Sequence, residues 1–306
     1  MYRILSTMAI IDKTQTMTRQ NDKYVPPHAR RSGGGAVNRN SPDTTTGATR
    51  AIFFGDSFIR LFGLVKNPSI TVKPFKGASA KGLTRAGNDN RLEICHIVKS
   101  RADRTDRWVF CFGSVDVNLS YYHKKFHLNE GEIDLEEIAK NYVDFVASLP
   151  FGEQSKTTIV GIYPSPLEDE DVAGSLVNYR SIDVLQMDRV LLSEDILLDN
   201  RQERIQTFNK ALKAQCQKHD LEYSDVFDAM IDGETHQMKD LYRDVSDHNI
   251  HVVWETTILL WLEKWEWLNK MAPPMLKQAL GRSLREYLDT KAWAERRHPS
   301  QLEQHC

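Results

Sequence analysis

The sequence predicts an α/β fold in which a mainly parallel β-sheet of about five strands is covered by helices on both faces. Short, almost continuous apolar runs alternate with longer segments whose apolar residues recur every three or four positions. Continuous apolar runs are typical of parallel strands buried on both faces, and the intervening amphipathic segments form the two outer helical layers. At 306 residues the chain is long enough to bury a sizeable core.

Five segments have the character of such strands, and several of them end at a glycine or a proline. The expected strands are 51–54 (AIFF), 69–75 (SITVKPF), 107–113 (RWVFCFG), 157–164 (TTIVGIYP) and 221–227 (LEYSDVF). Apolar residues at helical spacing predict helices over 134–149, 201–219 and 252–268. The last of these closes the domain.

The chain divides into three parts. Residues 1–49 lack periodicity and are rich in Pro, Gly, Ser, Thr and Asn, and eight Arg or Lys face three Asp in residues 1–50, so we expect a disordered basic N-terminal tail. The domain spans 50–271. Beyond the sequence MAPP, leucines recur every four residues in 272–306, which predicts an amphipathic C-terminal helix. This helix either packs on the domain or binds a partner.

Composition excludes several classes of protein. A formal net charge of −2 indicates neither nucleic-acid binding nor attraction to a membrane surface. No run approaches the ~20 apolar residues that span a bilayer, and the first residues lack the pattern of a secretory signal. The four cysteines form no CxxC pair, so we expect reduced thiols in a cytoplasmic protein, with no metal and no cofactor.

The tripeptide Gly55-Asp56-Ser57 follows the first expected strand directly. Glycine permits a sharp turn, and a helix that begins there directs N–H groups and the positive end of its dipole toward the serine hydroxyl. The carboxyl ends of parallel strands share one edge of a sheet, where ligands bind. The tripeptide therefore has two interpretations, a plain turn that caps a helix or the location of a nucleophile.

Other expected strands end in residues that a nucleophilic serine needs. The second ends in FKGASAKGL, where the N–H of Gly77 or of Ala80 could stabilise an oxyanion, and the third ends in GSVDVN (113–118). The sequence DVSDHNIHVVW (244–254) supplies aspartates and histidines later in the chain. A serine hydroxyl needs an imidazole to accept its proton, and the imidazole needs a carboxylate to fix its tautomer.

In this order, the serine, the glycine turn, the Gly-x-x-Asp turn and the late Asp/His pair resemble the SGNH (GDSL-type) hydrolase family over residues 50–270. The resemblance implies a three-layer α/β/α sandwich with a flavodoxin-like sheet, Ser57 as nucleophile, and an oxyanion hole formed by the N–H groups of Ser57 and Gly77. The family's third block normally reads Gly-x-Asn-Asp, whereas this chain reads Gly-Ser-Val-Asp, which resembles members with Gly-Glu-Ile/Val-Asp. Asn118 is the nearest candidate for the replaced oxyanion donor.

His251 is the expected base, because NIHVVW resembles the family's His followed by an apolar residue and a helix. The family spacing Asp-x-x-His is absent, and Asp247, four residues before His251, is expected to orient its ring. His248 is the alternative base. A metal site formed by Asp244, His248 and His251 is a competing interpretation, but it needs a helix where we expect a loop.

The expected activity is therefore that of a serine esterase, acyl hydrolase or acyltransferase that forms an acyl-serine intermediate on a small acyl ester. The resemblance implies an O-acylated glycan as substrate. The alternative is a catalytically weakened SGNH-fold binding module, because the third block and the Asp–His spacing depart from the family. In the tail, NDKYVPPHARR resembles a segment near the N-termini of some DEAD-box RNA helicases, which implies a protein or ribonucleoprotein partner through Tyr24–Arg31.

Overall fold

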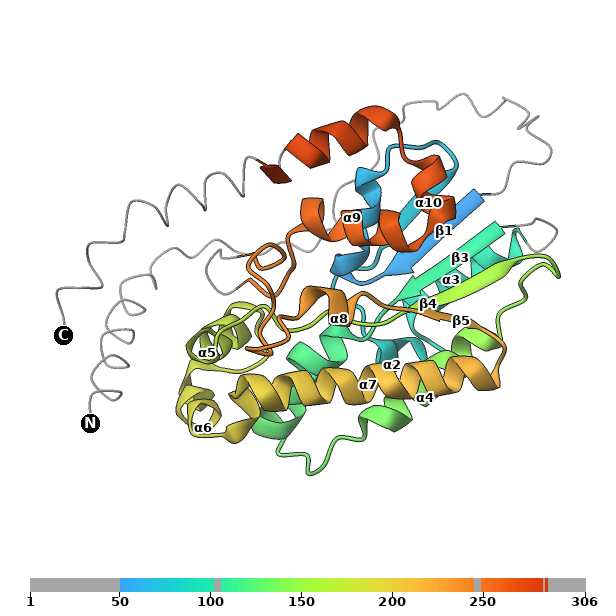
Figure 1. Cartoon of the computed structure of the whole chain (residues 1–306). Helices are drawn as coiled ribbons and strands as arrows, with labels where there is room; N and C mark the ends of the chain where they lie inside the picture. Colours follow the sequence, from blue (N-terminus) through green and yellow to red (C-terminus); the bar gives the residue numbers. More distant parts are fainter. Residues whose placement is uncertain (1–49, 102–105, 245–248, 283, 286–306) are drawn as a thin grey trace, which may run out of the picture. The chain divides into compact units, whose positions relative to one another are not determined.

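The computed structural model describes residues 50–101, 106–244, 249–282 and 284–285. Its centre is a five-stranded sheet in which all neighbouring strands are parallel, in the order β2-β1-β3-β4-β5 (Figure 1). The strands are β1 (Arg50–Gly55), β2 (Ile70–Pro74), β3 (Asp106–Cys111), β4 (Lys156–Val160) and β5 (Glu222–Ser224). This order is the flavodoxin-like arrangement, so the predicted fold class is confirmed. The expected tail at 1–49 and its Tyr24–Arg31 segment lie outside the described residues.

Helices cover both faces of the sheet, as the alternation of patterns predicts (Figure 1). Those before β4 are η3 (Ser57–Leu64), α2 (Ala80–Leu83), α3 (Asp89–Lys99), η4 (Asp116–Ser120), η5 (His123–His127) and α4 (Leu135–Ala147). Those after β4 are α5 (Asp169–Asn178), η6 (Val184–Gln186), α6 (Met187–Leu191), η7 (Glu194–Ile196), α7 (Leu198–Lys218), α8 (Phe227–Met230), α9 (Trp254–Lys264) and α10 (Glu266–Met271). Of these, η3 is a 3₁₀ helix, and η4 and η5 are π-helical.

Two clusters of buried apolar side chains hold the layers together. One lies between the sheet and α2, α3, α4 and α7, and includes Phe54 and Phe110. The other lies between the opposite face and η3, α8, α9 and α10, and includes Phe53 and Val109. Adjacent residues of one strand point to opposite faces, and both faces are buried along β1, β3 and β4, which explains why these three strands read as continuous apolar runs, whereas the edge strands β2 and β5 are more exposed.

The helix predicted over 252–268 is two helices in the structure. The backbone of Trp265 is extended (φ −110°, ψ 94°), so α9 ends before it and α10 begins after it. The indole N–H of Trp265 donates to Ser224 Oγ at 3.2 Å, and that of Trp261 donates to the Tyr163 hydroxyl at 3.0 Å. Buried indole N–H groups need such partners, and apolar periodicity alone does not report them.

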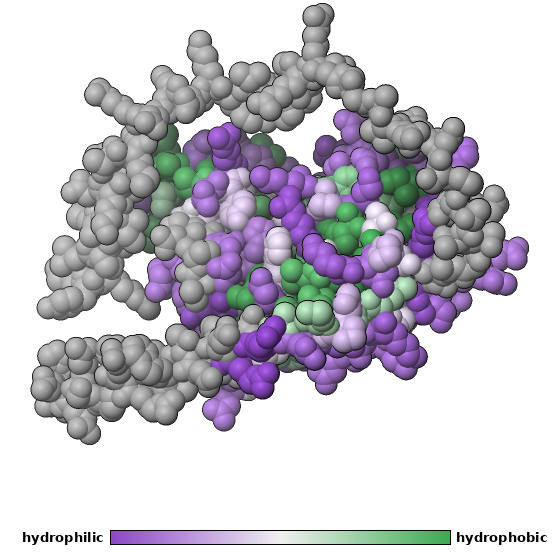
Figure 2. All heavy atoms as spheres, turned by 90° about the horizontal axis from the view of Figure 1, so that it is seen from above, coloured by the Kyte–Doolittle hydropathy of each residue, from purple (hydrophilic) through white to green (hydrophobic). Residues whose placement is uncertain are grey.

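Beyond α10 the chain is helical over 274–282. Leu280 is buried and Leu276 packs against the second cluster, so the described part of the C-terminal segment lies on the domain. Seen from above Figure 1, the coloured surface is mostly hydrophilic, with several separate groups of hydrophobic residues (Figure 2). Within the ranges described, no helix has both the length and the apolar character needed to cross a membrane.

Candidate active site

The Gly55-Asp56-Ser57 turn lies where β1 ends at the carboxyl edge of the sheet. A methyl group on Gly55 would lie 2.6 Å from the carbonyl oxygen of Cys111 and 2.6 Å from Cβ of Ile59, so only glycine fits between β3 and η3. The N–H of Asp56 donates to that Cys111 carbonyl at 3.1 Å, and its side chain accepts the N–H of Phe58 at 3.0 Å. This cap starts η3 with Ser57 as its first residue, half-buried at the rim.

The side chains of Ser57 and His251 meet at this edge although 194 residues separate them. Nε2 of His251 lies 2.7 Å from Oγ of Ser57. The histidine is held just before α9: Val252 pairs with Arg243 in an antiparallel bridge, and the N–H of Val253 donates to the carbonyl of Tyr242 at 2.9 Å. A serine hydroxyl at hydrogen-bond distance from an imidazole nitrogen is the arrangement of a nucleophile and its base.

Asn249 contacts the other ring nitrogen of His251, Nδ1. Its Oδ1 lies 2.8 Å from Nδ1 of His251 and accepts the backbone N–H of the same residue at 3.0 Å, while its Nδ2 donates to Oδ2 of Asp244 at 2.7 Å. A carboxylate only accepts hydrogen bonds, so Asp244 turns the amide nitrogen toward itself and the amide oxygen toward the ring. Nδ1 of His251 therefore carries the hydrogen, and Nε2 presents its lone pair to the Ser57 hydroxyl.

The surroundings of His251 favour its neutral form. Its ring lies near those of Phe58 and Tyr179, with centroids 4.8 and 6.4 Å away. Burial lowers the pKa of His251 from its usual value, the charges of Arg60 and Lys76 lower it further, and the carboxylate of Asp244 acts against them. A neutral imidazole is the form that accepts a proton from serine.

The backbone N–H groups of Ser57 and Gly77 are candidates for an oxyanion hole. Gly77 lies in the turn after β2 with φ +73°, a conformation that favours glycine, and nothing lies within 4 Å of where its Cβ would be. In the part of the chain that the structure describes, no group accepts the N–H of Gly77 or of Ser57. Both N–H groups are therefore available to a ligand.

The N–H of Ala80 is already engaged, which corrects its candidacy as an alternative oxyanion donor. It donates to Oδ2 of Asp116 at 2.5 Å, and the N–H of Lys81 donates to Oδ1 at 3.2 Å. The aspartate of the third block thus caps α2 and fixes the turn that contains Gly77. Sequence reasoning missed this contact, since a cap supplied by a residue 36 positions away leaves no local pattern.

Two buried carboxylates lie behind the site. Burial raises the pKa of Asp56 to about 7, with the charge of Asp116 adding to the effect and the N–H groups of Phe58, Ser114 and Val115 acting against it. Burial likewise raises the pKa of Asp116 to about 6, against the N–H groups of α2. The turn next to Ser57 therefore changes its charge close to neutral pH.

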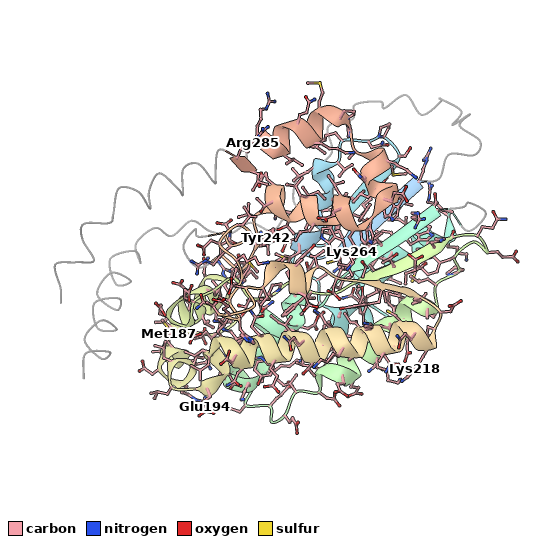
Figure 3. The ribbon with its side chains drawn as sticks, viewed as in Figure 1. Met187, Glu194, Lys218, Tyr242, Lys264 and Arg285 are labelled. Carbon is pink, nitrogen blue, oxygen red and sulfur yellow. The ribbon has the colours of Figure 1, made fainter. Side chains whose placement is uncertain are left out.

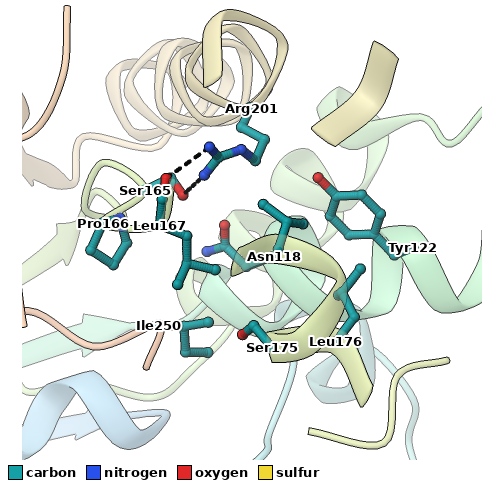
Figure 4. A pocket seen from close by; sticks show the side chains of 10 residues that line it. Asn118, Tyr122, Ser165, Pro166, Leu167, Ser175, Leu176, Arg201 and Ile250 are labelled. Carbon is teal, nitrogen blue, oxygen red and sulfur yellow. Dashed lines mark hydrogen bonds between the residues drawn. The ribbon is translucent and has the colours of Figure 1, made fainter. Parts of the chain in front are cut away.

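Asn118 lies on η4, and its side chain lines a small pocket of about 10 Å³ (Figure 4). Arg201 borders the same pocket and donates to Ser165 Oγ and to the carbonyl of Leu167. Ile250, which precedes His251, forms another side, but neither Ser57 nor Gly77 lines this pocket. Asn118 thus lines a water-sized space that the predicted oxyanion donors do not border.

Asp247 and His248, predicted as orienting carboxylate and alternative base, lie outside the described residues, as does part of the alternative metal set. In the described ranges, no group of three or more His, Cys, Asp or Glu is placed to hold a metal ion. The sequence did contain a signal for Asn249, since an Asn two residues before another residue often accepts that residue's N–H. Our expectation of a carboxylate partner obscured it.

No family model and no curated protein matches the sequence. Among solved structures, the chain is similar to a putative acylhydrolase from Bacteroides fragilis, with 14% identity, a TM-score of 0.45, and coverage of 80% of this chain and 91% of that one. It is also similar to a GDSL-like lipase from Bacteroides thetaiotaomicron (14% identity, TM-score 0.44, 77% and 89% covered). A carbohydrate acetylesterase from Sinorhizobium meliloti matches at 16% identity and TM-score 0.40, with 70% and 94% covered. At these identities the likeness concerns the fold, so the chemistry must be argued from the site itself.

Proposed function

We propose that this chain is a serine ester hydrolase of the SGNH type that cleaves a small acyl ester through an acyl-serine intermediate. The observation that carries the proposal is the 2.7 Å separation between Ser57 Oγ and His251 Nε2, with the lone pair of that nitrogen directed at the hydroxyl by Asn249 and Asp244. The order of Ser57, the Gly77 turn, the third block and His251 along the chain is a second, independent support.

In the proposed reaction, Ser57 Oγ attacks the ester carbonyl while His251 Nε2 takes its proton. The oxyanion is stabilised by the N–H groups of Ser57 and Gly77. His251 then gives the proton to the alcohol oxygen, the C–O bond breaks, and an acyl-serine remains. A water molecule, deprotonated by His251, releases the acid and restores Ser57. Asn249 and Asp244 keep the ring in the required tautomer throughout.

The proposed oxyanion hole has two donors rather than three. Asn118, which we expected to add a side-chain donor, lines a pocket that Ser57 and Gly77 do not border. One missing donor lowers turnover by ~10²–10³ in serine hydrolases. We therefore expect a slower enzyme than one with the full set. The glycan expected as the alcohol part of the substrate stays a prediction.

The test compares intact protein with Ser57→Ala and His251→Ala in hydrolysis of 4-nitrophenyl acetate. Both variants should lose nearly all turnover. Only binding and oxyanion stabilisation remain to accelerate the reaction once the nucleophile or its base is removed. His96→Ala is the matched control, since His96 is exposed on α3 and far in sequence from the site. In parallel, a fluorophosphonate should label Ser57, which intact-mass analysis detects. Equal rates and no labelling in all four proteins would instead favour the catalytically weakened binding module.

A further inference from the structure

Arg60 lies on the same face of η3 as Ser57. In a 3₁₀ helix, residues three apart eclipse one another, and Ser57, Arg60 and Gly63 form the accessible face, while Phe58, Ile59, Leu61 and Phe62 between them are buried. The Arg60 side chain is exposed, and its charge acts on His251. A cation therefore lies directly beside the proposed nucleophile and base.

Lys76 is a second exposed cation near the site. It is exposed and immediately precedes Gly77, whose N–H is a proposed oxyanion donor. Its charge also acts on His251, so both cations approach the imidazole from their separate segments, η3 and the turn after β2.

Lys81 and Lys124 are two further cations, both near Asp116. Both act on one another, and the pKa of Lys124 is lowered by partial burial and then by Lys81. Lys81 belongs to α2, whose N–H groups bind Asp116, and the charge of Asp116 acts on both Lys124 and Asp56.

Nearby carboxylates do not cancel this charge by direct pairing. Asp244 acts on His251 and Glu130 acts on Lys124, but no described carboxylate forms an ion pair with any of the four cations. The four are Arg60, Lys76, Lys81 and Lys124. Among the described residues, these four cations therefore have no direct ion-pair partner, in a protein whose formal net charge is −2.

We propose that Arg60 and Lys76, extended by Lys81 and Lys124, bind an anionic group on the alcohol part of the ester substrate. We assign the anion to the alcohol part because His251 protonates the alcohol oxygen in the proposed reaction. The leaving alcohol then lies near the imidazole, on which the charges of Arg60 and Lys76 act. Lysine and arginine both bind phosphate and carboxylate through charge-assisted hydrogen bonds. The inference rests on the proposed esterase function.

The experiment measures kcat/KM at pH 8 and low salt for three phenyl acetates that differ in the para group. Methyl 4-acetoxybenzoate is neutral, 4-acetoxybenzoate carries a carboxylate, and 4-acetoxyphenyl phosphate carries a phosphate. After correction for the rate with hydroxide alone, the anionic esters should be preferred about fivefold, and the preference should shrink at 0.5 M NaCl, where charges are screened. A preference for both anionic esters indicates that the cations bind carboxylate and phosphate alike. A preference for only one of them identifies the group that the cations bind.

The variant Arg60→Gln/Lys76→Gln should abolish this preference, measured as the ratio of kcat/KM for each anionic ester to kcat/KM for the neutral ester in the same protein, so that any general loss of activity cancels. Arg60→Lys should retain it. The matched control Lys210→Gln/Lys213→Gln removes two exposed charges from α7, toward the end marked by Lys218 in Figure 3. Unchanged anion preference in Arg60→Gln/Lys76→Gln, or no preference in intact protein, overturns the inference.

A binding measurement separates failure of this inference from failure of the esterase proposal. Phenyl phosphate and benzoate, which carry no ester, are titrated calorimetrically into Ser57→Ala. Saturable binding to Ser57→Ala supports the anion site even if no ester is hydrolysed, provided that the affinity falls at least about fivefold when Arg60→Gln and Lys76→Gln are combined with Ser57→Ala. Turnover that depends on Ser57 without anion binding or anion preference supports the esterase and overturns the anion site.

Discussion

Oδ1 of Asn249 lies 2.8 Å from Nδ1 of His251, where the side chain that orients the base is usually a carboxylate. The negative charge is one residue further away, on Asp244, which receives the amide N–H of Asn249 at 2.7 Å. An amide holds the tautomer of the ring without bringing a full charge against it. The imidazolium that forms during the reaction is therefore stabilised less directly than in a Ser-His-Asp triad.

Replacing Asn249 by alanine should lower kcat for 4-nitrophenyl acetate by about 10²-fold or more, because Nδ1 of His251 loses its acceptor and the ring can adopt the wrong tautomer. Asp244→Ala should cause a smaller loss, since the Asn249 oxygen still faces the ring although its amide can turn over. Steady-state kinetics with circular dichroism to confirm folding tests both. A larger effect of Asp244→Ala than of Asn249→Ala would contradict this arrangement.

Activity should depend on the neutral form of His251 and should be lost as the pH falls. Burial, Arg60 and Lys76 lower the pKa of His251, so the acid limb of kcat/KM should have its midpoint below the usual value of about 6.5. Arg60→Gln should shift this midpoint upward and Asp244→Ala downward, because the two charges act on the ring in opposite directions. A pH profile centred above 6.5 in the intact protein would be inconsistent with this environment.

The buried carboxylate of Asp56 should make the protein more stable as the pH is lowered from 8 to 5. Its pKa is raised to about 7 in the folded chain, against about 3.9 when unfolded, so the folded chain binds the proton first. This stabilising contribution is complete below the unfolded value and is lost as the pH rises through 7, at up to about 1.4 kcal/mol per pH unit. Urea unfolding of Asp56→Asn should show a weaker dependence on pH, whereas parallel curves for variant and intact protein would reject this explanation.

Gly55→Ala should destabilise the fold by about 1–3 kcal/mol, since its methyl group meets Cys111 and Ile59 at 2.6 Å. Movement of the turn should also displace Ser57 and reduce esterase activity. Gly63→Ala on the same helix is the control, because nothing lies within 4 Å of the added methyl group. Urea unfolding and turnover are both measured, and equal effects of the two substitutions would show that close packing at Gly55 is not the cause.

Apolar periodicity was sufficient to predict the five strands and the layers, because burial on both faces of a parallel sheet determines residue type along whole segments. The break at Trp265 was not predictable in this way, since it depends on a hydrogen bond from the indole to Ser224 in β5. In the site, the turn at Ser57 and the late His251 could be located from strand ends. The roles of Asn249 and Asp116 could not, because they depend on which amide or carboxylate oxygen meets which N–H in three dimensions.

Ser57 and His251 lie 194 positions apart in the sequence, and this separation has a consequence for synthesis of the chain. The first strand and its serine leave the ribosome early, yet the histidine and the helices that pack beside it follow only after β5. Trp261 and Trp265 lie against Phe62 of the serine-bearing helix, with ring centroids 5.6 and 5.7 Å away, so the early segment also awaits these late aromatic rings. On the proposed mechanism, a nascent chain therefore cannot hydrolyse an ester until the last part of the domain has joined the first.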